Sequence, residues 1–182
     1  NTTDVMERIA VFENNITIYT PFNLGTRGTS GLELNGKYAP LRWLSINGDL
    51  NLFQFVRKGA YENQNFDFSG NRWSTRLTTK IKLPFDLAFE ITGNYNSTYK
   101  TLQGQMAGFG FADVGLRKKL WKGRGVVNVS LRDIFASRLS ERTIDNDSTY
   151  QYTHSQRGRF VVIGFSYGFG KGEAMSYSGR RR

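Results

Sequence analysis

The sequence predicts an all-β fold, an antiparallel barrel of about eight strands that crosses a lipid bilayer, and three observations support this prediction. Residues 87–99 alternate apolar, aromatic or small side chains with mostly polar ones. The alternation extends far enough for a tilted transmembrane strand, which needs roughly nine to eleven residues. Hydrophobic residues make up only 38% of the chain whereas aromatic residues reach 14%, as expected when each strand has one wet face. The third observation is that short and long polar connections alternate along the chain.

The composition excludes several other classes. No run approaches the roughly 18 consecutive apolar residues of a membrane-spanning helix. The absence of cysteine and the presence of a single histidine exclude a disulfide framework, thiolate metal sites and histidine clusters. The net charge of +10 permits a polyanionic partner but does not identify one. The chain begins Asn-Thr-Thr-Asp, without an initiator Met or a signal segment, so we expect a processed protein or a fragment.

Eight stretches follow one another along the chain, and their order predicts a meander in which each strand pairs with the next. The first is a short mixed run at residues 5–12, and a long loop over residues 14–29 follows it. The others lie at residues 30–38, 44–52, 73–83, 87–99, 112–119, 127–132 and 159–169. Phe66 and Phe68 have the opposite phase to the strand at 73–83, so we expect a β-bulge near Gly70 and Asn71.

The connections indicate which end of the barrel is which. We expect short turns at residues 40–42, 84–86 and 122–125, and longer polar connections at residues 57–65, 101–108 and 137–157. Outer-membrane barrels have short turns on the periplasmic side and long loops outside the cell. We therefore assign residues 1–170 to an outer-membrane barrel and residues 171–182 to a basic C-terminal tail.

The two parities of these strands predict two different faces. The apolar parity should face lipid, and it comprises Leu32, Leu34, Leu44, Ile46, Leu50, Trp73, Leu77, Leu87, Phe89, Ile91, Tyr95, Val127, Val129, Ile163, Phe165 and Tyr167. The other parity carries a basic wall that should face the lumen, with Lys37, Arg72, Arg76, Lys80, Lys82, Arg117, Lys119 and Arg132. Such a wall could attract an anionic solute. It could equally be solvated, ion-paired or in contact with a plug domain.

Two further segments are candidates for recognition or chemistry. The connection at residues 137–157 contains Tyr150, Tyr152 and His154, and it is either a site for a ligand or surface lipoprotein or a disordered crown. Residues 164–168 match the G-x-S-x-G nucleophile elbow, but here a strand continues and the single histidine lies upstream. We therefore predict no catalytic, cofactor-binding or metal-binding residue and no enzymatic activity.

Three segments resemble the C-terminal part of TonB-dependent receptor barrels, specifically the Bacteroidota outer-membrane β-barrel family. They are NLGT (23–26) with GLELNG (31–36), Pro40 and WLSING (43–48); DVGLRKKL (113–120) with LRDIF (131–135); and RFVVIGFSYGFG (159–170). The resemblance implies a longer protein with a plug domain, a TonB-contact segment and about twenty-two strands, of which this chain would be the last third or so. It implies TonB-driven import of a bulky nutrient such as an iron chelate, a cofactor or a glycan.

The resemblance also implies partners. The last strand, with Phe165, Tyr167 and Phe169, is similar to the aromatic-terminated strand that the barrel-assembly machinery reads. The other expected partners are outer-membrane lipid, the remaining barrel and plug of the same receptor, the TonB system and a surface lipoprotein, and we expect no nucleic acid. Two alternatives stay open: a self-contained eight-stranded barrel with a structural or adhesion role, and a soluble basic β-sheet protein that binds polyanions.

Overall fold

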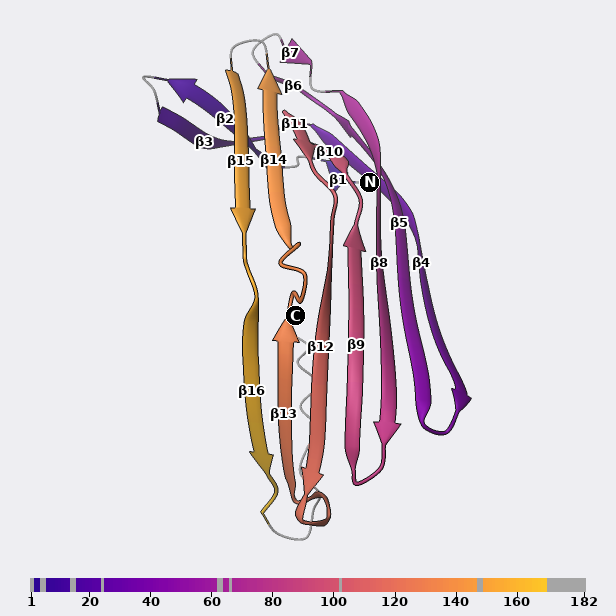
Figure 1. The fold of residues 1–182 in the computed structure, drawn as a ribbon. Coiled ribbons are helices and arrows are strands. Elements are labelled where there is room, and N and C mark those ends of the chain that lie inside the picture. The colour runs from indigo at the N-terminus through magenta and orange to yellow at the C-terminus, as the bar shows by residue number, and fades with distance from the viewer. Residues whose placement is uncertain are drawn as a thin grey trace.

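The computed structural model describes residues 2–3, 6–13, 16–23, 25–61, 64–65, 67–101, 103–146 and 149–169. Within these residues the main sheet has eight antiparallel strands, in the order β1-β4-β5-β8-β9-β12-β13-β16 (Figure 1). Their bounds are β1 Thr2–Thr3, β4 Thr26–Leu41, β5 Leu44–Lys58, β8 Phe68–Leu83, β9 Leu87–Asn96, β12 Phe109–Leu120, β13 Gly125–Arg132 and β16 Phe160–Tyr167. The predicted all-β antiparallel meander is therefore confirmed. No helix in this described part is long and apolar enough to cross a membrane.

A second sheet continues the wall at the end where the connections are long. It has the order β10-β11-β14-β15 (Tyr99–Thr101, Gly104–Met106, Leu139–Asn146 and Thr149–Gln156) and lies beyond β9, β12, β13 and β16 (Figure 1). The predicted connections at residues 101–108 and 137–157 are thus mostly strand. The sequence did not predict these strands because their hairpins carry polar side chains on both faces, and apolar–polar alternation arises only where one face is apolar.

The N-terminal prediction was wrong. Residues 5–12 do not form a wall strand, because β2 (Met6–Glu13) pairs with β3 (Ile16–Asn23) in a separate hairpin, and β4 already begins at Thr26. The segment predicted as a loop contains the run Ile16, Thr17, Ile18, Tyr19 and Thr20, whose β-branched and aromatic residues favour a strand. Asn14 and Asn15 lie outside the described residues.

The first turn lies later in the chain than predicted, and a bulge precedes it. β4 continues to Leu41, so the turn is formed by Arg42 and Trp43 rather than by residues 40–42. The pairing with β5 shifts between Tyr38 and Leu41, which leaves two residues of β4 opposite one of β5. Pro40 belongs to this bulge, where a residue without an N–H is tolerated because it need not donate to the ladder.

The bulge expected near Gly70 and Asn71 is absent, because the described pairing of β5 with β8 is continuous through Phe55↔Gly70 and Gln54↔Asn71. Phe68 instead has the same parity as Arg72 and packs edge-to-face on Phe55, with ring centroids 5.9 Å apart. A Cβ on Gly70 would lie 2.7 Å from the Phe55 ring. The glycine therefore leaves room for an aromatic side chain of the neighbouring strand.

The other short turns lie at the same end of the sheet as the first one (Figure 1). Phe85 and Asp86 have φ of 62° and 57°, and Trp121 and Lys122 have φ of 51° and 53°. The turn expected at residues 122–125 is the short 3₁₀ segment η1 (Trp121–Gly123) followed by Arg124, and Gly125 already belongs to β13. A short connection at one end thus alternates with a longer one at the other, as predicted.

The main sheet is open rather than closed. Among the described residues, β4 and β16 do not pair with each other. Within the part of the chain that the structure describes, the outer edge of β4 is paired at Thr26 and Arg27 alone, with β1. Little of the wall is a conventional core, since Val126 and Ile144 are the only fully buried hydrophobic residues in the described part. Large apolar side chains instead lie on the surface of the sheet.

Candidate functional site: two faces and an outer end

One face of the main sheet is apolar, and all sixteen residues predicted to face lipid lie on it by strand parity and register. We call this the apolar face. One row across it comprises Leu44, Ile81, Phe89, Leu116, Val129 and Ile163. Leu32, Leu77 and Ile163 expose 53%, 55% and 73% of their surface. Such exposure along a whole sheet marks an interaction surface.

Aromatic side chains mark both ends of the apolar face. At the short-turn end, Trp121 packs edge-to-face against Phe165 and Tyr167, with centroids 6.3 and 5.7 Å apart. At the other end the rings of Trp73 and Tyr95 lie 4.8 Å apart. From Trp73 to Leu83 at the end of β8, the strand extends about 33 Å at about 3.3 Å per residue. A tilt of about 45° reduces this to roughly 23 Å, close to the apolar band of about 25 Å in outer-membrane barrels.

The opposite face, which we call the polar face, carries all eight basic residues predicted for the lumen. Lys80 pairs with Glu90 at 3.0 Å, and Arg132 pairs with Asp113 at 2.8 Å. Arg76 Nε donates to Asn94 Oδ1 at 2.9 Å, and the guanidinium of Arg72 lies 4.7 Å from the Tyr99 ring centre.

The other four basic residues of the polar face form no ion pair with any described residue. They are Lys37, Lys82, Arg117 and Lys119. The wall is therefore ion-paired in part and keeps excess positive charge.

The turn that follows β13, at residues 133–138, is held by a buried carboxylate, and we call it the Asp133 corner. Asp133 is 2% exposed and has a φ of 53°. Its Oδ1 accepts from the Ser137 amide at 2.9 Å, and its Oδ2 accepts from the Arg138 amide at 3.0 Å. The string LRDIF includes Asp133, but the alternation gave no signal of this role. An Asp directly after the last alternating residue, where it can form a turn with its own backbone, was the available clue.

The outer hairpin β14–β15 brings two of its three candidate residues together. Tyr152 Oη donates to Glu141 Oε1 at 2.6 Å, and His154 Nδ1 lies 3.2 Å from the same oxygen. These hydrogen bonds hold the pKa of the Glu141 carboxyl below its usual value, while the bond to Glu141 raises the pKa of the Tyr152 hydroxyl. Tyr150 pairs with Asp145, further toward the hairpin tip, and is 70% exposed. Residues 139–146 and 149–156 are thus an ordered hairpin rather than a disordered crown.

The last strand ends in exposed aromatic residues. Phe165 is 61% and Phe169 89% exposed, and the rings of Tyr167 and Phe169 lie 4.9 Å apart. The basic tail predicted at residues 171–182 lies outside the described residues.

The comparison with protein families decides the class of this chain. Residues 1–167 match the model of the Outer membrane protein beta-barrel family. The chain belongs to this family. No curated protein and no solved structure matches it.

Membership of this outer-membrane barrel family confirms the predicted barrel fold and outer-membrane location. The location also argues against the soluble polyanion-binding alternative, in which the apolar face would pack inside a globule. It makes outer-membrane lipid a partner of the protein. The likeness to TonB-dependent receptors and to Bacteroidota proteins stays a prediction.

Proposed function

We propose that this outer-membrane barrel protein forms wall and outer loops of a TonB-dependent receptor-like transporter, which takes up a bulky nutrient such as an iron chelate, a cofactor or a glycan. The role is non-enzymatic: the wall encloses a path, and its side chains act through charge and shape. The apolar face contacts lipid, and the polar face lines the lumen or meets a plug.

The observation that carries the proposal is the pair of open edges. β4 is 16 residues long, and along most of it the outer backbone groups have no described partner strand. In hydrocarbon each unpaired N–H or C=O costs several kcal/mol, so wall strands need partners on both sides. Natural edges are blunted by short strands, bulges, charges or Pro. This edge is long, its bulge and Pro40 lie only at its turn end, and its charged residues Glu33 and Lys37 have the parity of the polar face. Additional strands of the same protein are the simplest partners, and a barrel of more strands has a wider lumen.

The polar face and the ends of the wall fit this role. Excess positive charge on Lys37, Lys82, Arg117 and Lys119 suits an anionic solute or an acidic plug surface. The barrel-assembly machinery would recognise the exposed aromatic residues of β16, and a surface lipoprotein or ligand would meet the β14–β15 hairpin with Tyr150, Tyr152 and His154.

Two measurements test the proposal. The first is the intact mass of the native protein from outer membranes: we expect a mass far above 20.7 kDa, whereas an equal mass with heat-modifiable migration supports the self-contained barrel. The second is energised uptake of ferric chelates, corrinoids and oligosaccharides by cells with and without this protein. Uptake of one class should require both this protein and a functional TonB protein. A large mass with no TonB-dependent uptake of any class would contradict the transport role.

A further inference from the structure

The apolar face contains a row of small residues that interrupts its cover of large side chains. In register, the small residues of the row are Gly36, Gly48, Gly93 and Ala112, and the one large side chain among them is Leu77. A Cβ on Gly36 or Gly93 would meet nothing within 4 Å. The backbone there is not approached by any other part of the described chain, so these glycines open space on the surface rather than allow close packing.

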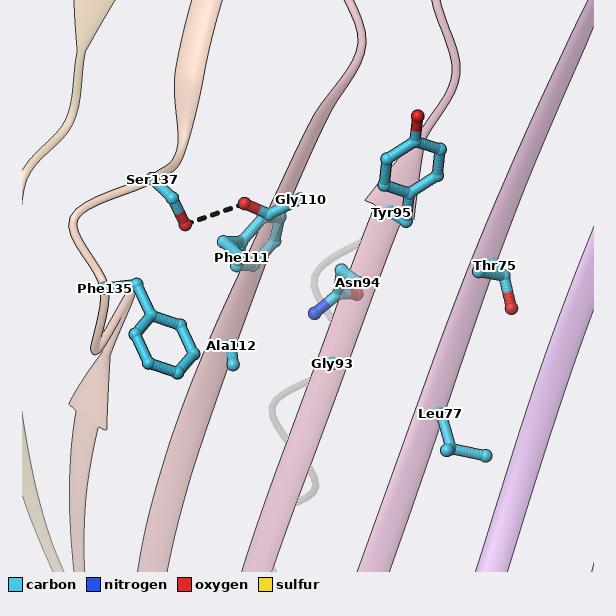
Figure 2. Close-up of a pocket in the computed structure, with 10 residues that line it drawn as sticks. All are labelled: Thr75, Leu77, Gly93, Asn94, Tyr95, Gly110, Phe111, Ala112, Phe135 and Ser137. Carbon is cyan, nitrogen blue, oxygen red and sulfur yellow. Dashed lines mark hydrogen bonds between the residues drawn. The ribbon is translucent and has the colours of Figure 1, made fainter.

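At β8, β9 and β12 this row deepens into a hollow of about 360 Å³ (Figure 2). Gly93, Gly110 and Ala112 form its floor, and Leu77 and Tyr95 border it. Asn94 and Phe111 contribute backbone, because Asn94 bonds to Arg76 and Phe111 packs under Arg138 on the opposite face. In Figure 2 the Tyr95 hydroxyl points toward the outer end of the strand, away from Gly93.

Phe135 forms one side of the hollow, and the Asp133 corner holds it there. The Ile134 amide donates to the Ala112 carbonyl at 2.8 Å, which continues the β12 pairing past the end of β13. Ser137 Oγ donates to the Gly110 carbonyl at 2.7 Å. Phe135 thus stands beside Ala112 (Figure 2) and is 71% exposed.

The polar side chains among the described lining residues are bonded elsewhere or directed away from the hollow. Of its three hydroxyls, that of Thr75 donates to the Asp49 carbonyl at 3.0 Å and that of Ser137 donates to the Gly110 carbonyl. The third, on Tyr95, points away from Gly93 toward the outer end of the strand (Figure 2). No charged side chain lines the hollow. An occupant must therefore be apolar.

The position of the hollow identifies that occupant. It is continuous with the lipid-contacting face and lies just beneath the Trp73–Tyr95 aromatic level at the long-connection end. In outer-membrane barrels this end is extracellular, so the hollow lies in the outer leaflet, below the headgroups. Hydrocarbon is as apolar as the lining, so retention must come from close packing of a chain against the wall.

We infer that this hollow is a binding site for one acyl chain of an outer-leaflet lipid. The chain lies across the glycine floor between Leu77 and Phe135, and packing holds it longer than the lipids around the rest of the wall. The site depends on the outer-membrane location alone and not on what the protein carries, so it can fail while the transport proposal holds.

Photolabelling tests this site. The native full-length protein is reconstituted in phosphatidylethanolamine vesicles that contain a small share of phosphatidylethanolamine with a diazirine in one acyl chain. After illumination, mass spectrometry locates the labelled residues. We expect label to concentrate on residues 93–95, 110–112 and 135, above its density on the rest of the apolar face.

Two glycine variants form a matched pair. Gly93→Leu fills the hollow, and Gly36→Leu adds the same side chain to the same face and row where it also meets nothing within 4 Å. Gly93→Leu should reduce label at residues 110–112 and 135 about tenfold, whereas Gly36→Leu should leave it unchanged. Phe135→Ala, which removes one side, should also reduce the label, and heat-modifiable migration establishes that each variant is folded. Equal labelling in both glycine variants, uniform labelling of the face, or exclusion of label by a second protein chain would each overturn the inference.

Discussion

The backbone amide of Asp133 donates a hydrogen bond of 2.8 Å to the carboxylate of Asp113, which also pairs with the guanidinium of Arg132 at 2.8 Å. Asp133 in turn uses its own carboxylate to cap the amides of Ser137 and Arg138. Asp113 of β12 and Asp133, just past the end of β13, therefore stabilise the turn from the wall into the outer hairpin. The buried position of Asp133 makes this corner sensitive to substitution.

Asp133→Ala should destabilise the corner. The substitution leaves two amides without an acceptor at a site that is 2% exposed, which costs about 1–3 kcal/mol. Hydrogen exchange of residues 134–138 should become faster, and thermal unfolding should occur at a lower temperature. Asp145→Ala, at an exposed residue of β14, serves as the control and should change neither measurement. Unchanged exchange in Asp133→Ala would show that the corner does not depend on this carboxylate.

Adjacent residues of β13 should differ in their access to water. Val129 lies on the apolar face and Ser130 on the polar face. The chain contains no cysteine, so Val129→Cys and Ser130→Cys each provide one reporter. A charged thiol reagent should label Ser130→Cys in intact outer membranes, while Val129→Cys should react only with a lipid-soluble reagent or after denaturation. The reverse order of reactivity would exchange the two faces and refute the whole assignment.

The hydrogen bond between Tyr152 and Glu141 should be visible in titrations. It raises the pKa of Tyr152 and lowers that of Glu141. The Glu141 contribution to stability is therefore present above the ordinary pKa of a glutamate and is lost as the pH falls through the lowered value. The Tyr152 contribution is present below the ordinary pKa of a tyrosine and is lost as the pH rises through the raised value. The cluster should thus stay intact over the whole range between.

Glu141→Gln provides the measurement. It removes the negative acceptor, so the ultraviolet titration of Tyr152 should move down toward the ordinary tyrosine range. If Tyr152 titrates identically in the native protein and in Glu141→Gln, the hydrogen bond is not formed in solution.

Alternation of apolar and polar residues predicted the wall strands from β4 to β16 and the two parities of their residues, but not β1, because a strand whose two faces have unlike surroundings has a period of two. It could not predict where strands break. The alternation predicts one strand over residues 87–99, with Ser97 as the one polar residue at the apolar parity, yet β9 ends at Asn96. The Ser97 hydroxyl accepts a hydrogen bond from the Trp73 amide at 2.9 Å, and Tyr99 then lies against Arg72 rather than on the apolar face.

The cluster around Glu141 and the hollow beside Phe135 were not predicted either, because alternation does not determine which residues of different strands lie opposite one another. Ser and Thr side chains can form hydrogen bonds with backbone groups in place of a partner strand. The alternation of residues in the sequence does not show where this happens. The cluster around Glu141 depends on the pairing of β14 with β15, in which Glu141 lies opposite His154. A polar segment of unknown register cannot reveal such a contact. The hollow beside Phe135 likewise depends on the register that aligns Gly93 with Ala112.

The turn at Trp121 should show a compensating pair of substitutions. A Cβ on Gly125 would lie 2.5 Å from the Trp121 ring, which also contacts Phe165 and Tyr167 of β16. Gly125→Ala should therefore force the ring away and lower the free energy of unfolding by about 1–3 kcal/mol, as overpacking does. In the Trp121→Ala background the same change should cost far less, because the ring is gone. Urea unfolding of the four proteins in lipid vesicles gives the coupling energy, and a Gly125→Ala penalty that is equal in both backgrounds would show that Trp121 does not cover this glycine.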